Sequence, residues 1–141
     1  PHTYFLYSEG EQVAVIEADI VVAGTTYKVY VTHLGNGGPI FQMRQMLDLM
    51  RGQENVIAMG DFNYRPYEEQ YAITTAEYDD AYMQAAESVA PSTWGEDQPF
   101  DIGERIDHVF VSPGTPVLYV EYFTQPESDH PGLFAEIGIN K

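Results

Sequence analysis

Two neighbouring segments with strand periodicity, joined by a turn, constrain the fold of this chain most strongly. The segment Gln12–Val22 has apolar residues at its even positions after the first, while its odd positions include Glu17 and Asp19. Because side chains alternate between the two faces of a strand, this pattern predicts a strand with one apolar and one wet face. Turn residues at 23–26 then lead into a β-branched and aromatic segment, Tyr27–Leu34, which predicts a β-hairpin.

The remaining periodicity predicts one clear helix and several more strands. We expect a helix from Pro39 to Gly52, because apolar residues recur there at helical spacing between a proline and a glycine. The pattern over Tyr67–Ser88 indicates an interrupted helix, and Ala90–Gly103 is expected to be irregular. Further strands are predicted at residues 3–7, 55–60, 105–112, 117–124 and 133–139. This order predicts an α+β fold with a mixed, mostly antiparallel sheet and helices on one face.

Composition limits the function classes. The chain has 141 residues, enough for one domain with a real core, and it has no cysteine, which excludes thiolate metal sites and a cysteine nucleophile. Its 22 acidic and 6 basic residues give a formal charge of −16. Proteins that bind polyanions normally displace counterions with a basic surface. We therefore expect no stand-alone DNA binding.

Polar residues follow, interrupt or precede several of the predicted strands. A carboxylate inside an apolar strand, as at Asp107, is costly unless it is paired. Polar groups at the ends of neighbouring strands can converge on one edge of a sheet, where a rigid scaffold positions them. The residues placed in this way are His33, Asp61, Asn63, Asp107, Asp129 and His130.

Four short motifs occur in a fixed order along the chain: THL at 32–34, GDFN at 60–63, RIDHVFVS at 105–112 and SDH at 128–130. This ordered set resembles the endonuclease/exonuclease/phosphatase superfamily of metal-dependent phosphoesterases, and the resemblance runs from about Val13 to Ile137. It implies a four-layer αββα sandwich made of two similar halves. Residues 1–141 would then form a single partial domain, the C-terminal half of that sandwich without its N-terminal half.

By that resemblance, three residues handle the cation and the attacking water. Asp61 matches a base or water-orienting carboxylate that also faces the metal, Asn63 a neutral donor to a phosphoryl oxygen, and Asp129 a metal-facing carboxylate. The implied cofactor is Mg²⁺ or Mn²⁺, because hard divalent cations take oxygen ligands and neutralise phosphoryl charge. The implied ligand is a phosphoester substrate.

The resemblance also assigns the histidines. His130 matches a residue that touches the scissile phosphate, and Asp107 the carboxylate that hydrogen-bonds it and should raise its pKa. His33 matches a second histidine that contacts phosphate. From the residues alone, Arg65 is a candidate phosphate clamp or a plain surface residue, and His108, next to Asp107, should point to the opposite face and be structural.

The family's principal metal-ligating glutamate comes from the first half of the sandwich, and nothing before Gln12 supplies it. We therefore expect the inner apolar face of the sheet to need a cover, either an N-terminal companion segment or a second copy of the chain. The run VTHLGNGG resembles a variant found in C-terminal domains of multi-span membrane proteins involved in lipid-anchor remodelling, which implies proximity to a membrane.

The sequence thus predicts a metal-dependent phosphoesterase that hydrolyses a phosphodiester or phosphomonoester with an activated water, incomplete without an N-terminal segment. Two alternatives stay open. One is a non-catalytic binding or regulatory domain of a larger, membrane-associated protein. The other is a plain acidic module that binds cations by carboxylate number alone, without any histidine requirement. The substrate class and the cellular compartment are left open.

Overall fold

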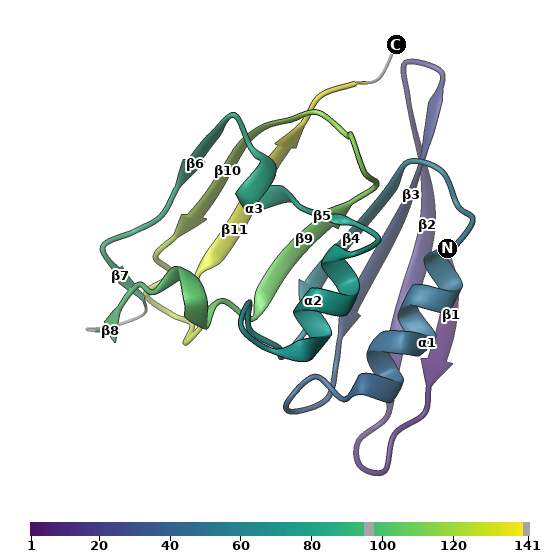
Figure 1. Cartoon of the computed structure of the whole chain (residues 1–141), viewed down its shortest axis with the longest axis horizontal. Coiled ribbons are helices and arrows are strands. Elements are labelled where there is room, and N and C mark those ends of the chain that lie inside the picture. Colours follow the sequence, from purple (N-terminus) through teal and green to yellow (C-terminus); the bar gives the residue numbers. More distant parts are fainter. Residues whose placement is uncertain (95–97, 140–141) are drawn as a thin grey trace.

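A computed structural model describes residues 1–94 and 98–139 of the chain (Figure 1). The helices are α1 (Ile40–Met50), α2 (Glu69–Thr75) and α3 (Ala81–Gln84), with a 3₁₀ turn at Ile102–Glu104. The strands are β1 (His2–Leu6), β2 (Val13–Val22), β3 (Thr25–His33), β4 (Val56–Asp61), β5 (Asp79–Asp80), β6 (Glu87–Val89), β7 (Thr93–Trp94), β8 (Gln98–Pro99), β9 (Asp107–Val111), β10 (Val117–Phe123) and β11 (Gly132–Ile137).

The strands form one large sheet and two small ones. The large sheet has the order β1-β2-β3-β4-β9-β5, a second sheet has the order β11-β10-β6, and β7 pairs with β8. Most neighbours are antiparallel, whereas β3 and β4 run parallel and are joined through α1, as a parallel pair requires. The expected α+β class with a mixed, mostly antiparallel sheet is therefore confirmed.

The predicted hairpin forms between β2 and β3 with the turn at Ala23 and Gly24. Both residues have positive φ, at 49° and 82°, and the favoured two-residue turn requires this of its central positions. The hairpin brings β3 to the middle of the large sheet, so that the end of β3 lies beside the end of β4.

Helix α1 covers one face of the large sheet, and Figure 1 shows α1 and α2 on the same side of it. Apolar residues of α1 recur at helical spacing and join the larger core with Tyr30 of β3, Ala58 of β4 and Phe110 of β9. The buried residues that α1 contributes to this core are Met43, Met46, Leu47 and Met50. This packing holds β3, β4 and β9 in a fixed order.

The opposite face is covered only in part. Val109 and Val111 of β9 pack there in a second core with Val117 and Val120 of β10. The apolar even positions of β2 also lie on this face, and Ile16 is 48% exposed. The predicted alternation holds only in part, because Val13 and Val15, on the side predicted to be wet, are buried in the larger core, while the predicted apolar side is the open one. We call this surface, made of Phe5, Ile16, Ile20, Val22 and Val31, the open face.

The interrupted helix predicted over Tyr67–Ser88 is largely replaced by α2, β5, α3 and β6. A buried ion pair accounts for the difference: Arg105 Nη2 lies 3.0 Å from Asp80 Oδ2, and both side chains are almost fully buried. Asp80 also accepts a hydrogen bond from the Tyr71 hydroxyl at 2.6 Å and from the Tyr82 amide at 3.1 Å. These contacts hold residues 79–80 against β9 as a short strand and then start α3.

The segment expected to be irregular, Ala90–Gly103, contains the short β7–β8 pair and the 3₁₀ turn, and its residues 95–97 lie outside the described part of the chain. Over residues 1–94 and 98–139, no helix has the length and apolar character needed to cross a lipid bilayer.

Candidate active site

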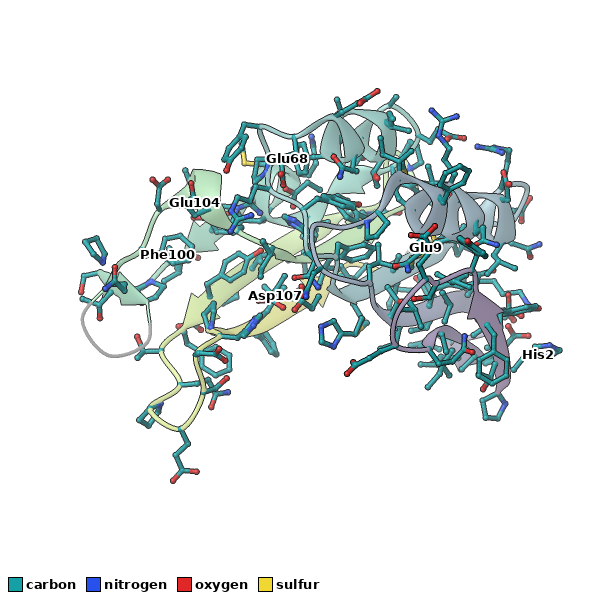
Figure 2. The ribbon with its side chains drawn as sticks, turned by 90° about the horizontal axis from the view of Figure 1, so that it is seen from below. His2, Glu9, Glu68, Phe100, Glu104 and Asp107 are labelled. Atoms are coloured by element: carbon teal, nitrogen blue, oxygen red, sulfur yellow. The ribbon has the colours of Figure 1, made fainter. Side chains whose placement is uncertain are left out.

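Three candidate site residues form a row across the large sheet. The register pairs His33 of β3 with Asp61 of β4, and Asp61 in turn with Asp107 of β9. Residues paired in this way project from the same face of a sheet at adjacent positions. Three residues that are far apart in the sequence therefore lie side by side in the large sheet. Figure 2 labels Asp107, which lies near the middle of that view.

Gly60 makes this row possible. Its φ is +142°, and a Cβ at this position would lie 1.9 Å from the carbonyl oxygen of Thr32 on β3. Only glycine allows the two backbones to approach so closely at this conformation. The glycine of the GDFN motif thus positions Asp61 beside β3, a requirement that becomes visible only with the strand register.

The turn after β4 fixes Asp61 and Asn63 together. Asp61 Oδ1 accepts a hydrogen bond from the Asn63 amide at 2.9 Å, and Asn63 adopts a positive φ of 57°, which asparagine tolerates better than most residues. The Asn63 side-chain nitrogen donates to the Leu34 carbonyl oxygen at 2.7 Å. An amide nitrogen carries two N–H bonds, so this contact uses only one of its two donors.

His130 approaches the same row from the loop before β11. Its Nδ1 lies 2.7 Å from Asp107 Oδ2, and its Nε2 lies 3.9 Å from Asp61 Oδ2. On the other side, His33 Nε2 lies 3.3 Å from the same Asp61 oxygen. Asp61 is thus flanked by two imidazole rings, and its carboxylate is only 14% exposed whereas His33 is 75% exposed.

The two partners of the His130–Asp107 pair shift in the same direction for different reasons. The hydrogen bond to Asp107 raises the pKa of His130, and burial only partly offsets it. Burial raises the pKa of Asp107 by more than its hydrogen bond to His130 lowers it. The imidazolium form of His130 is therefore favoured to higher pH than in a free histidine, with Nδ1–H donating to Asp107 and Nε2–H facing the Asp61 side.

Two buried side chains, Tyr122 and Arg105, hold the backbone of Asp107 in place. The Tyr122 hydroxyl of β10 donates to the Asp107 carbonyl oxygen at 2.7 Å, and Arg105 Nη1 donates to the same hydroxyl at 3.3 Å. Arg105 is in turn paired with Asp80, so a buried network on rigid elements supports the carboxylate that orients His130. The sequence patterns carried no signal for Tyr122, because its position depends on how β10 packs against β9.

The donor atoms of Asp61, Asp107 and His130 all lie within 4.8 Å of one another, a spacing that fits one metal ion. Two carboxylates in such a group suit a hard divalent cation such as Mg²⁺ or Mn²⁺. Asp129 lies at the same edge, with Oδ1 4.0 Å from His130 Nε2 and with a side chain exposed to solvent.

Arg65 and His108 lie outside the row of His33, Asp61 and Asp107. Arg65 is paired with Glu104 at 2.7 Å, and this contact raises the pKa of Arg65. His108 lies on the opposite face, as expected, where it is fully buried and its Nε2 lies 2.8 Å from the Tyr64 carbonyl oxygen. Burial lowers the pKa of His108 to about 4, so it stays neutral at physiological pH.

Comparisons with known proteins give a consistent picture. The sequence profile of the Endonuclease/Exonuclease/phosphatase family matches residues 26–130, which include every candidate site residue. No curated protein sequence matches the chain.

Several solved structures share its fold. A mannosyl-6-phosphatase from Bacteroides thetaiotaomicron superposes with a TM-score of 0.80 at 19% identity, over 98% of this chain and 65% of the other. An endonuclease/exonuclease/phosphatase from Bacteroides vulgatus gives 0.79 at 22% identity, over 99% of this chain and 64% of the other. The human Nocturnin catalytic domain with bound sulfate gives 0.69 at 18% identity, over 98% and 58%. The chain thus spans less than two thirds of the length of these structures.

Proposed function

Since the chain belongs to the endonuclease/exonuclease/phosphatase family, we propose that it supplies the histidine-bearing part of a metal-dependent phosphoesterase, which hydrolyses a phosphoester bond with water. The observation that carries this proposal is the row His33–Asp61–Asp107, completed by the hydrogen bond of His130 to Asp107. Scattered surface carboxylates would show neither the paired histidine nor the shared sheet face.

The chemistry follows from what each side chain is free to do. Asp61 Oδ1 accepts a hydrogen bond from the backbone N–H of Asn63, which leaves Oδ2 between the two histidines. This second oxygen can orient an attacking water and accept a proton from it. His130 presents Nε2–H on the same side, where it can donate to a phosphoryl oxygen or a leaving oxygen. The remaining N–H of Asn63 is a second, neutral donor for phosphate.

Asp61 and Asp129 would hold the divalent cation, with Asp107 as a further nearby carboxylate. When bound, Mg²⁺ or Mn²⁺ would neutralise charge on the phosphoryl oxygens. The cation would also draw in a substrate that an acidic chain repels, because the net charge of −16 opposes approach of any phosphate.

This function also calls for a cover over the open face. We expect a further segment of the same protein to supply it, since the solved relatives carry more than a third of their length beyond the part that this chain matches. Sedimentation of the 141-residue chain alone would test this. The chain should self-associate through the exposed apolar side chains, and a clean, stable monomer would count against the cover.

The phosphoesterase proposal is tested by hydrolysis of bis-p-nitrophenyl phosphate by the full-length protein with Mg²⁺ or Mn²⁺. Asp61→Ala and His130→Ala should each lower kcat by roughly 100-fold or more, the usual contribution of a positioned acid or base. Glu54→Gln, an exposed charge before β4, is a matched control and should leave the rate unchanged. Activity that persists in either alanine variant would refute these roles, and an inactive wild-type protein that still binds the ester would favour the non-catalytic alternative.

A further inference from the structure

A cleft of about 1220 Å³ adjoins the candidate active site, with His33 on its rim. One wall is the loop between β1 and β2, residues 7–12, and the other is the segment from Leu34 to Gln42 that ends β3 and begins α1. Because His33 belongs both to this cleft and to the row beside Asp61, any group attached to a phosphate at Asp61 has a direct path into the cleft.

A buried glutamine joins the two walls. Gln42 is only 3% exposed, its Nε2 donates to the Tyr7 carbonyl oxygen at 3.2 Å, and its Oε1 accepts from the Gly35 amide at 2.8 Å. A second amide, Gln45, accepts from the Tyr7 backbone N–H at 2.8 Å. The two walls are therefore fixed relative to each other by hydrogen bonds from α1 to residues that follow β1 and β3.

The lining combines carboxylates with exposed aromatic rings. Glu9 and Glu11 supply two negative charges, and no lysine or arginine lines the cleft within the described residues. The rings of Tyr7 and Phe41 line it as well, although they are 59% and 74% exposed. Aromatic faces beside carboxylates attract cations, and quaternary ammonium groups in particular.

The positive end of α1 does not reverse this preference. Pro39, which precedes α1, also lines the cleft, and a helix N-terminus carries the equivalent of about half a positive charge. The two negative charges of Glu9 and Glu11 outweigh this partial positive charge.

The rest of the surface offers little positive charge to a polyanion. Four basic side chains are already paired with carboxylates; they are Lys28, Arg51, Arg65 and Arg105.

We propose that the cleft between residues 7–12 and 34–42 binds a positively charged amine group of the phosphoester substrate, with Glu9 and Glu11 as counter-ions and Tyr7 and Phe41 as aromatic contacts. This inference rests on the phosphoesterase function proposed above. It names the substrate class as a phosphoester whose other group is a protonated or quaternary amine, and it disfavours polyanionic nucleic acid as the substrate.

Two chromogenic esters with the same chromophore test the inference in the full-length protein. The first is p-nitrophenyl phosphorylcholine, which carries a quaternary amine, and the second is bis-p-nitrophenyl phosphate, which carries none. In the Glu9→Gln/Glu11→Gln double variant and in Phe41→Leu, kcat/KM for the choline ester should fall on the order of 5-fold relative to bis-p-nitrophenyl phosphate, which lacks the amine. Glu54→Gln is the matched control and should leave the ratio unchanged.

Calorimetric titration with phosphorylcholine separates this inference from the function on which it rests. Binding to the wild-type protein that weakens in the double variant, and not in Glu54→Gln, supports the cleft even if neither ester is hydrolysed. An unchanged ratio of kcat/KM together with unchanged binding in the double variant overturns the cleft proposal, while hydrolysis lost in Asp61→Ala would still uphold the phosphoesterase.

Discussion

Replacing Gly60 with alanine tests whether close approach of β3 and β4 builds the site. At a φ of +142° a non-glycine residue costs about 1–3 kcal/mol. The added Cβ would lie 1.9 Å from the Thr32 carbonyl oxygen, where contacts under 3.0 Å essentially never occur, so the two strands have to separate. Loss of one or two ladder hydrogen bonds adds about 1 kcal/mol each. We therefore expect Gly60→Ala to lower the free energy of unfolding by about 2–5 kcal/mol.

Gly114→Ala is the matched control for this prediction. Gly114 also has a positive φ, at 79°, but a Cβ there would meet nothing within 4 Å, so only the backbone strain of about 1–2 kcal/mol remains. Urea titration followed by circular dichroism measures both. With a slope near 2 kcal/mol per molar urea, Gly60→Ala should lower the midpoint by roughly 1–2.5 M and Gly114→Ala by roughly 0.5–1 M. Equal losses would refute the argument from the strand contact.

Three further predictions concern the charged groups. Asp107→Asn should lower the pKa of His130, measured by NMR titration, because that hydrogen bond is the main cause of its rise. The stabilisation by protonated His130 is fully present below about pH 6.5, and it is lost as pH rises through the higher pKa of the folded state. Asp107→Asn should therefore lower the free energy of unfolding most below about pH 6.5. An unchanged pKa of His130 in this variant would contradict the pairing. Asp80→Asn should cost about 3–5 kcal/mol in urea titration, against under about 1 kcal/mol for Glu77→Gln at its exposed pair with Arg51. Chelation by EDTA should abolish hydrolysis by the full-length protein and Mg²⁺ should restore it, with an unchanged far-UV spectrum because both cores are apolar; activity that survives chelation would exclude a metal requirement.

Local patterns predicted the elements that local interactions determine. The β2–β3 hairpin and helix α1 lie within a few residues of their predicted bounds, because the alternation, the turn and the helical spacing are all short-range signals. The prediction of an interrupted helix over Tyr67–Ser88 was wrong, because β5 depends on the ion pair of Asp80 with Arg105, which lies 25 residues later in the chain. No periodicity within the segment reports such a contact.

The candidate site shows the same division. Motif order selected His33, Asp61, Asp107 and His130, and the structure brings their side chains together, but their pairing follows from strand register that no single motif encodes. Gln42 carried no sequence signal as a bridge across a cleft, since its two partners, Gly35 and Tyr7, lie in other elements of the chain. Its role appears once β1 and β3 are placed side by side with α1.

The open face and the active site are parts of one surface. Val31 precedes His33 by two residues and Met59 precedes Asp61 by two, so each pair projects from the same side of its strand. Ile16 pairs with Val31 and lies on that side as well. A segment that covered Ile16 and Val31, as proposed above, would therefore extend beside His33, which is 75% exposed. Removal of water from that edge would strengthen every interaction of Asp61 with the two histidines, because charges attract more strongly in a lower dielectric. The proposed cover and the proposed catalysis would thus be coupled through β3, because Val31 and His33 lie on the same side of that strand.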